Sequence, residues 1–474
     1  MMTILRIGLV ILTSVLQAFG GPNGSEAKQS PPSPATTDSF SHYLIRCGHA
    51  IDPKSGRVQK DIGIEINQGK IVSTRPWESI KSPKAIKVIN AQGKFVLPGL
   101  IDTHAHLYGG VGRQSKDRQN CNPSVPPMLL AAGVTSAGVP GAMDPVADRA
   151  LRAQIERGEI LGPRLFLAGR YFEGPQGEIP WMQFVRSLDE ALALVDAEHA
   201  AGAAAIKIYN HFPAEWLQAT TRRAHQHGMK VWAHLGEVTY AQAMSMGVDH
   251  IHHGIRYMKE ARSDKTSAGS QEAPYFRDSN DLMVVGVLKM ASNEGTVLTP
   301  TLGVGLLSTP GFTTGSDLAL QKPYFTQEAW ERISEWNVHG LPGLDQAKVK
   351  AAHLAQQAFV RRAQAEGCLL AAGTDVLIFR QLPGHSLWHE LELMAEAGLS
   401  PMEVLRAATW HGAIAMGAEK ELGSIEAGKL ADLIILDKDP LAQISHIRTV
   451  RTVIKGGKPL VPDEIRRPWI GRVH

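Results

Sequence analysis

The sequence predicts an α/β protein in which a (β/α)8 TIM barrel carries a small composite β-sandwich domain built from both ends of the chain. Three observations predict this architecture. Apolar strand-like segments alternate with longer amphipathic segments in the middle of the chain, short alternating segments occur at both ends, and 474 residues exceed one ordinary domain. A doubly wound sheet is the alternative arrangement for the same alternation.

The first twenty residues have the features of a signal peptide. Arg6 precedes an uncharged, mostly apolar stretch, and small residues follow at Gly20 and Gly21. An uncleaved N-terminal anchor is the alternative. We therefore predict a signal peptide over residues 1–20 and a Gly-, Ser- and Pro-rich linker over residues 21–40. The expected protein is exported, periplasmic or secreted, and has no stable membrane span after signal cleavage.

Residues 41–96 and 416–474 are the two predicted parts of the β-sandwich domain. Segments such as DIGIEINQGKIVS near the start and KLADLIILDKD and VRTVIKGGKPLV near the end are short and punctuated by Gly and Asn. This pattern is typical of a small antiparallel sheet. The barrel is then expected over residues 97–415.

Eight predicted barrel strands share an apolar run and alternate with helical patterns such as SLDEALALVDAEHAAG and FTQEAWERISEW. The strands are FVLPGLIDT, GVTSAGV, RLFLAG, AAAIKIY, KVWAH, VDHIHH, TVLTPT and CLLAAGTD. In a barrel, polar residues at the carboxyl ends of the strands gather in one mouth.

Two histidines follow the first predicted strand, as His104 and His106. Alternate residues of an extended strand face the same side, so both rings can point at one ion. An H-x-H pair is a weak signal by itself, because surface histidines are common. Its position directly after an apolar strand favours a metal site.

Four further strand ends carry residues of ligand type. They are Lys207, His234, His253 and Asp375. His250 and His252 compete with His253, but in a strand His252 points opposite to His253, so we expect only one of the two to reach the mouth.

Lys207 interrupts an otherwise apolar strand. A buried lysine is rare because desolvation of its charge is costly. An unseen acidic partner is the ordinary explanation; the alternative is that burial lowers the pKa and leaves a neutral amine. A neutral amine can capture carbon dioxide as a carbamate, whose two oxygens can bridge two cations. Nitrogen and oxygen ligands suit Zn2+, with Mn2+, Co2+ or Fe2+ as alternatives, and a bridged pair would lie about 3.5–4 Å apart.

Composition excludes few other functions. Basic and acidic residues nearly cancel, with a formal net charge of +3 and no block of Lys and Arg, so nucleic-acid binding has little support. Cys47, Cys121 and Cys368 form no C-x-x-C pair, so a disulfide scaffold is not expected. We expect Cys368 to be a buried structural thiol.

Taken together, FVLPGLIDTHAHL, AIKIY, AH at His234, HHG at His253 and AAGTD at Asp375 resemble the amidohydrolase superfamily. The segment HELELMAEAGLSPMEVLRAATWHGAIAMGAEKELGSIEAGKLADLIILDKDPL is especially similar. The nearest subgroup comprises imidazolonepropionase-related and Xaa-Pro dipeptidase-like enzymes. His252 departs from that subgroup, which often carries Glu at this position.

The resemblance implies a role for each ligand. His104, His106 and Asp375 would hold the more buried ion, His234 and His253 the second, and carboxylated Lys207 would bridge two Zn2+. Asp375 would also take a proton from the bridging water and deliver it to the leaving group. The implied activity is hydrolysis of a carbon–nitrogen bond, amide or peptide, by a metal-activated hydroxide. The substrate would be a small molecule such as a dipeptide or an N-acyl amino acid, and a homo-oligomer is compatible with the family.

Three further residues are candidates for contacting the substrate. Tyr209 lies two residues past Lys207, and His385 follows the eighth strand in LPGHS. A packed aromatic ring and a solvated loop residue are their ordinary explanations. Arg170 could bind a substrate carboxylate, with a structural ion pair as the alternative.

Two other functions stay open. The run from His234 to Glu237 has the H-x-x-E spacing of several barrel deaminases, which hold a single metal ion and use Glu as a proton shuttle. Lys207 argues against this alternative, because such enzymes need no bridging lysine. A non-catalytic binding protein on the same scaffold is the second alternative, since a fold does not by itself define a function.

Overall fold

The computed structural model describes residues 42–80, 86–109, 122–177, 182, 184–261, 278–306, 309–311, 315–340, 345–375 and 381–474. The predicted signal peptide, the predicted linker and Cys121 lie outside these ranges. Within them, every helix is too short or too polar to cross a membrane.

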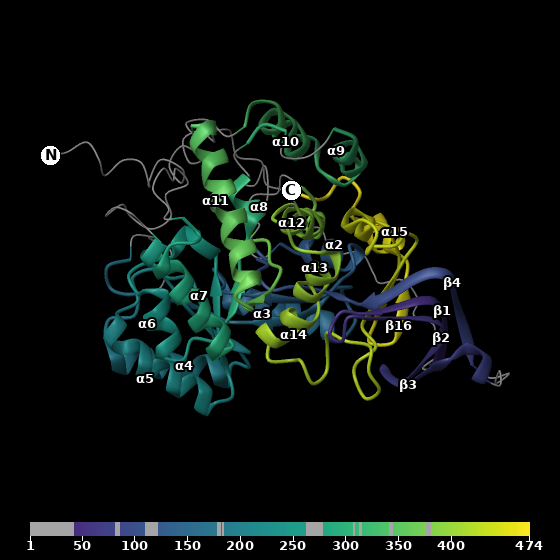
Figure 1. The fold of residues 1–474 in the computed structure, drawn as a ribbon, viewed down its shortest axis with the longest axis horizontal. Helices are drawn as coiled ribbons and strands as arrows, with labels where there is room; N and C mark the ends of the chain where they lie inside the picture. The colour runs from purple at the N-terminus through teal and green to yellow at the C-terminus, as the bar shows by residue number, and fades with distance from the viewer. Residues whose placement is uncertain are drawn as a thin grey trace.

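The two ends of the chain build one seven-stranded sheet, as predicted for a composite β-domain (Figure 1). Its order is β16-β15-β14-β4-β1-β2-β3. The strands are β1 (His42–Asp52), β2 (Arg57–Asn67), β3 (Lys70–Pro76), β4 (Lys87–Pro98), β14 (Leu433–Leu436), β15 (Val450–Lys455) and β16 (Lys458–Leu460). The joint between the two ends is the antiparallel pair of β4 and β14. The sandwich arrangement and the domain boundaries stay predictions.

One pair in this sheet corrects the expectation of an antiparallel arrangement. β1 and β4 run parallel, from Tyr43 opposite Lys87 to Ala50 opposite Val96. The reason is topological: β1, β2 and β3 are successive antiparallel neighbours, and β4 then returns to the free edge of β1. A local alternation of apolar and polar residues does not indicate which distant strand β4 pairs with, or in which direction.

The middle of the chain forms two parallel sheets. One has the order β5-β6-β7 and the other β13-β12-β11-β10-β9-β8, and every pair in both is parallel. The strands are β5 (Leu100–Asp102), β6 (Val134–Val139), β7 (Arg164–Leu167), β8 (Tyr171–Phe172), β9 (Ala205–Ile208), β10 (Lys230–Ala233), β11 (His250–His252), β12 (Val297–Thr299) and β13 (Leu369–Leu370). Each of the eight predicted strand segments therefore contains a strand, and β8 is an additional short one.

Backbone hydrogen bonds join both edges of the three-stranded sheet to the six-stranded sheet. Thr103 N, just after β5, donates to Ala372 O, just after β13, at 3.0 Å. Ala204 N, just before β9, donates to Leu167 O at the end of β7, at 2.8 Å. The first and the last strands of the central region are thus neighbours, although about 270 residues separate them.

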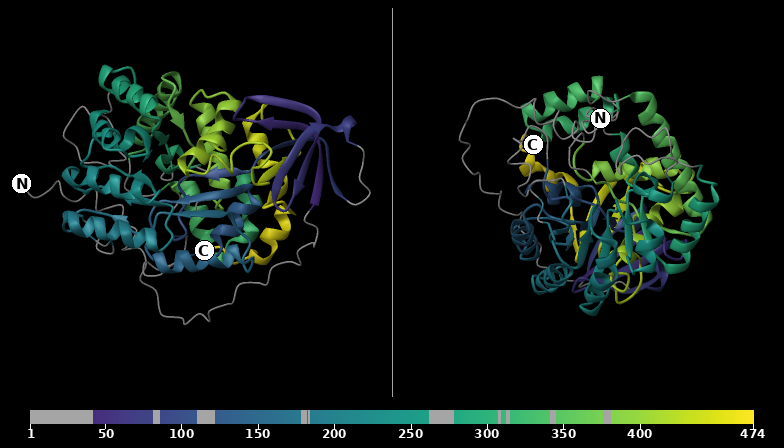
Figure 2. Two further views of the ribbon diagram at one scale, coloured as in Figure 1. Left: turned by 90° about the horizontal axis from the view of Figure 1, so that it is seen from below. Right: turned by 90° about the vertical axis from the view of Figure 1, so that its left-hand side faces the viewer.

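Helices lie around these strands (Figures 1 and 2). The helices are α2 (Val125–Ala131), α3 (Pro145–Glu156), α4 (Leu188–Ala200), α5 (Ala214–Gln226), α6 (Tyr240–Ser245), α7 (Leu282–Glu294), α8 (Leu302–Leu306), α9 (Gly315–Gln321), α10 (Gln327–His339), α11 (Gln346–Ala365), α12 (His385–Glu396), α13 (Pro401–Ala407), α14 (Trp410–Ala415) and α15 (Pro462–Arg466). Both amphipathic segments quoted above are helical, as α4 and α10. Cys368 is 3% exposed, which confirms its prediction as a buried thiol.

We predict that the joint between the chain ends is a major source of stability. Ile435 lies on β14 between β4 and β15 and is 2% exposed. The substitution Ile435→Ala should lower the free energy of unfolding by about 2–5 kcal/mol, because it leaves a cavity in the β-domain. Chemical denaturation measures this change. Val72→Ala on β3, at a site that is 44% exposed, is the control and should change it by less than about 0.5 kcal/mol. Equal effects of the two substitutions would contradict the prediction.

Candidate metal centre

A buried carboxylate brings the ends of β5 and β13 together. Asp102 is fully buried and accepts hydrogen bonds from His104 N at 3.0 Å, Thr374 N at 3.1 Å and Thr374 Oγ1 at 2.8 Å. Asp375 N also donates to His104 O at 2.7 Å. These bonds place the residue pair His104 and His106 directly beside Asp375.

His104, His106 and Asp375 form the centre of the cluster. His104 Nε2 lies 3.2 Å and His106 Nε2 3.1 Å from the same carboxylate oxygen, Asp375 Oδ1. Both rings therefore point the same way, as the H-x-H spacing predicts. In the described part of the chain, the ligand atoms of His104, His253 and Asp375 all lie within 4.8 Å of one another, which is a spacing that could hold a metal ion.

His252 corrects the expectation that only one of the adjacent histidines reaches this cluster. His252 Nδ1 is hydrogen-bonded to His104 Nδ1, and the ring centroids of His253 and His104 are 4.9 Å apart. The physical reason is that β11 ends at His252 and that His253 adopts a left-handed backbone conformation, with φ of 76°. The strand alternation therefore stops before His253, and both rings turn towards His104.

His234 and Lys207 complete the predicted set. The His234 and His253 rings have centroids 4.2 Å apart, and Lys207 is 1% exposed and electrostatically coupled to Asp375. Several buried nitrogens here have no hydrogen-bond partner, among them Lys207 Nζ, His234 Nε2 and His253 Nε2. Buried polar groups are normally paired, so these atoms fit a site that binds a cation or, at Lys207, a covalent modification.

Burial favours the uncharged form of His104, His234, His253 and Lys207, whereas Asp375 is ionised. Burial lowers the pKa of His104 to about 3 and lowers the pKa of His234 and His253 well below the ordinary histidine value. Burial also lowers the pKa of Lys207 to about 7, although the charge of Asp375 opposes this. Burial alone would raise the pKa of Asp375, but His104 and its hydrogen bonds hold it well below the usual range. Deprotonated ligands of this kind are what a divalent cation requires.

Backbone strain is concentrated in the cluster. In the described ranges five non-glycine residues have positive φ, and three of them lie here: His253, Thr301 at 48° and Asp375 at 50°. Each of the three lies shortly after the end of a parallel strand. Such conformations cost on the order of 1–3 kcal/mol each and persist where the surrounding contacts hold them.

Four of the eight tyrosines in the sequence surround the histidines. Tyr209 packs against His234 with centroids 4.6 Å apart, which places this predicted residue beside the cluster. The other three, Tyr108, Tyr171 and Tyr257, were not predicted from the sequence. Tyr108 lies 4.9 Å from the His106 ring and its hydroxyl is 2.6 Å from that of Tyr171, while the Tyr257 ring lies 4.1 Å from that of His234. Like the histidines, all four lie near the end of a strand. Their position relative to the predicted strands could therefore have identified them from the sequence.

Burial keeps three of these phenols in their neutral form. It raises the pKa of Tyr108, Tyr171 and Tyr209 well above the usual value. Their hydroxyl groups can therefore donate hydrogen bonds at neutral pH.

The remaining candidates contact other parts of the protein. His385 packs against Trp388, with ring centroids 4.3 Å apart, and is electrostatically coupled to Arg448 and Arg466. Arg170 Nη1 lies 3.3 Å from Glu198 Oε1, and this is the structural ion pair that was its alternative explanation. The role of His385 towards a substrate stays a prediction.

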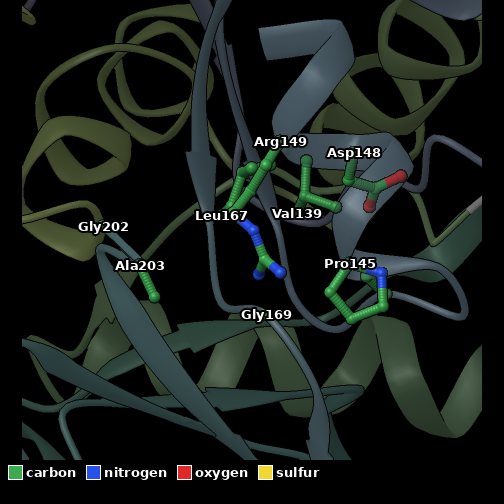
Figure 3. Close-up of a pocket in the computed structure, with 9 residues that line it drawn as sticks. Val139, Pro145, Asp148, Arg149, Leu167, Gly169, Gly202 and Ala203 are labelled. Carbon is green, nitrogen blue, oxygen red and sulfur yellow. The ribbon is translucent and has the colours of Figure 1, made fainter. Parts of the chain in front are cut away.

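Glu198 also pairs with Arg149, at 3.5 Å. Arg149 lines a separate small pocket beside α3 (Figure 3). The lining residues of this pocket are Val139, Ala142, Pro145, Asp148, Arg149, Leu167, Gly169, Gly202 and Ala203. None of the histidines of the cluster belongs to it.

Neutral histidines around one carboxylate, at the carboxyl ends of parallel strands, define a class: this is the type of site found in metal-dependent hydrolases. The family model described as "Amidohydrolase family" matches residues 95–460. The chain belongs to the amidohydrolase family, and it is a hydrolase that acts on carbon–nitrogen bonds.

Individual relatives agree with this assignment. Imidazolonepropionase of Geobacillus kaustophilus is 25% identical over 429 residues, which covers 84% of this chain and 89% of that enzyme. A Xaa-Pro dipeptidase structure with bound methionine in its active site has a TM-score of 0.68 and 25% identity, over 89% of this chain and 100% of that chain. A putative prolidase from Bifidobacterium longum has a TM-score of 0.66 and 26% identity, over 89% and 94%.

We predict that Lys207 makes the stability of the metal-free protein depend on pH. Its pKa of about 7 lies below the ordinary value of 10.5, so the unfolded chain binds more protons than the folded chain between these values. Stability should therefore increase with pH in this window, by up to about 1.4 kcal/mol for each pH unit. The Lys207→Met variant should lack this increase. Denaturant unfolding of both chelator-treated proteins at pH 7 and pH 9 measures it, and parallel changes in the two proteins would contradict the prediction.

Proposed function

We propose that this protein is a two-metal hydrolase that cleaves an amide or peptide bond in a small substrate such as a dipeptide or an N-acyl amino acid. The observation that carries the proposal is the set of buried, unpartnered nitrogens of Lys207, His234 and His253 gathered beside the Asp375 carboxylate. The relatives described as a Xaa-Pro dipeptidase and a prolidase support a dipeptide. The signal-like residues 1–20 further support the proposal that the enzyme acts outside the cytoplasm.

We also propose that β5, β6, β7 and β9–β13 close into the (β/α)8 barrel expected from the sequence. The hydrogen bonds of Thr103 to Ala372 and of Ala204 to Leu167 support closure, because each joins one edge of the three-stranded sheet to the six-stranded one. All the proposed ligands then lie at the same mouth, since Lys207 lies near the carboxyl end of β9 and the other ligands follow the carboxyl ends of their strands.

The proposed ligand sets are those that the family resemblance implies. His104 and His106 share Asp375 Oδ1 and would hold one ion together with that carboxylate. His234 and His253 would hold a second, and Lys207, carboxylated on its free Nζ, would bridge the two. Zn2+ suits these ligands, with Mn2+, Co2+ or Fe2+ as alternatives. Ions bound there would lower the pKa of water towards about 7 and polarise a substrate carbonyl.

The protein residues themselves would move the proton. Asp375 is ionised and lies at the centre of the cluster, so it can accept a proton from the attacking water. The same carboxyl can then donate that proton to the departing amine. Tyr209 holds a neutral phenol beside His234 and can donate a hydrogen bond to a polar group of the substrate.

The deaminase alternative has less support. It needs Glu237 as a proton shuttle near the ion, but the Glu237 side chain is 64% exposed and lies 3.7 Å from Lys259 Nζ. A single-metal mechanism also leaves the buried Lys207 without a role.

A substrate screen tests the proposal directly. Zn2+-loaded protein should hydrolyse members of a panel of dipeptides, N-acyl amino acids and lactones, and mass spectrometry of the products identifies the bond that is cut. Protein treated with a chelator should be inactive and should recover when Zn2+ is returned. Absence of bound metal and of hydrolysis in freshly purified protein would instead favour the non-catalytic alternative.

Asp375→Asn is expected to lower kcat by about 100- to 10,000-fold, because an amide cannot accept and return the proton. The measurement is kcat on the best substrate of the screen, with metal content determined for each sample. Asp196→Asn, at an exposed pair with Arg223 on α4 and α5, is the control and should keep the activity. Full activity of Asp375→Asn would exclude its assignment as the base.

Glu237→Gln separates the two enzymatic alternatives. The exposed position of this side chain leads us to expect kcat and KM within about twofold of the unmodified enzyme, as for a surface substitution. A loss of activity comparable to that of Asp375→Asn would favour the deaminase.

A further inference from the structure

The hydroxyl of Thr301 contacts the ring of His253. Thr301 Oγ1 lies 3.0 Å from His253 Nδ1, and the two residues are 1% and 2% exposed. This contact occupies Nδ1 and leaves Nε2 as the unpartnered nitrogen of the ring. In a neutral imidazole that binds an ion through Nε2, the proton resides on Nδ1 and needs an acceptor. The hydroxyl oxygen of Thr301 is the nearer acceptor at 3.0 Å, since Asp375 Oδ2 lies 3.7 Å from the same nitrogen.

Thr301 performs this task in a conformation that a branched side chain avoids. Its φ of 48° lies in the left-handed region, where a β-branched residue is an outlier. The segment that carries it also holds the His253 backbone, because His253 N donates to Thr299 O at 2.7 Å. His253 is therefore fixed at two points by the chain that follows β12.

Glu390 holds this strained segment in place from α12. Its two carboxyl oxygens accept hydrogen bonds from the two amides that directly follow Thr301, Leu302 N at 2.8 Å and Gly303 N at 2.7 Å. Glu390 is fully buried, and both bonds link helices that are far apart in the sequence, α8 and α12. The carboxyl thus anchors the backbone immediately after the strained residue.

We propose that Thr301 is a positioning residue that sets the tautomer and orientation of His253 for binding the second ion, and that Glu390 acts through it by anchoring the start of α8. The inference rests on the proposed function, because it assigns these residues to the proposed second metal site. Neither residue is one of the proposed metal ligands.

The test is the affinity of purified protein for Co2+, measured by competition with a chelator and by the visible absorption of the bound ion. Thr301→Val keeps the branched shape and removes the hydroxyl, and it should weaken binding of the second Co2+ about 10- to 100-fold, as loss of a partner to a ligand histidine does. Thr301→Ser keeps the hydroxyl and should restore most of the affinity. Thr220→Val on α5 is the matched control, since Thr220 is buried, donates to Trp216 O at 2.9 Å and should leave both affinities unchanged.

Thr301→Gly separates the hydrogen bond from the strain and remains informative if Thr301→Val does not fold. It removes the hydroxyl and relieves the backbone, so the protein should stay folded by circular dichroism while losing affinity for the second Co2+ as Thr301→Val does. In the wild-type background, Glu390→Gln should lower the affinity for the second Co2+. In the Thr301→Val background it should cause no further loss of affinity, because Glu390 acts through Thr301.

The outcomes are distinguishable from failure of the proposed function. Wild-type affinity for two Co2+ ions in Thr301→Val and Thr301→Gly would overturn the role of Thr301. Independent, additive effects of Glu390→Gln and Thr301→Val would overturn the role of Glu390. A wild-type protein that binds no Co2+ would overturn the metal site itself.

Discussion

The carboxylate of Asp102 is the constraint on which the rest of the site depends. It ties the backbone after β5 to the backbone after β13 through His104 N and both donors of Thr374. Complete burial raises the pKa of Asp102 to about 6, because removal from water opposes the hydrogen bonds that favour its charge. Without these hydrogen bonds, the relative positions of the strand ends that carry the histidines and Asp375 would not be fixed. Metal sites tolerate only small displacements of their ligands, so the site depends on them.

The cluster places the negative charge of Asp375 among histidines that burial keeps neutral. Histidines that remain unprotonated do not repel a cation, and the ionised Asp375 attracts it. The cost of burying unpaired polar atoms such as Lys207 Nζ is tolerated where a ligand supplies the missing partner. His253 and Asp375 both have a left-handed backbone conformation, which is energetically unfavourable for residues other than glycine. The contacts within the cluster stabilise these turns, which direct the two side chains towards the site.

Much of this could be predicted from the sequence because strand alternation and strand ends are local features. The eight central strands, the shared direction of His104 and His106 and the burial of Lys207 follow from apolar runs of the right length. The contact of His252 with His104 did not follow, because a left-handed residue at position 253 interrupts the alternation. The parallel pairing of β1 with β4 and the hydrogen bond from His253 to Thr301 depend on which distant segments become neighbours, and no local pattern records that choice.

The composite sheet has a consequence for how the chain is made. β4 emerges early in synthesis, but its partner β14 lies more than three hundred residues later. Until that partner arrives, β4 presents an unsatisfied backbone edge, which is the kind of surface that captures other extended chains. Because the chain is synthesised from its N-terminus, we expect folding of the composite sheet to be delayed. The nascent polypeptide would remain extended or bound to a chaperone until its C-terminal segment is released.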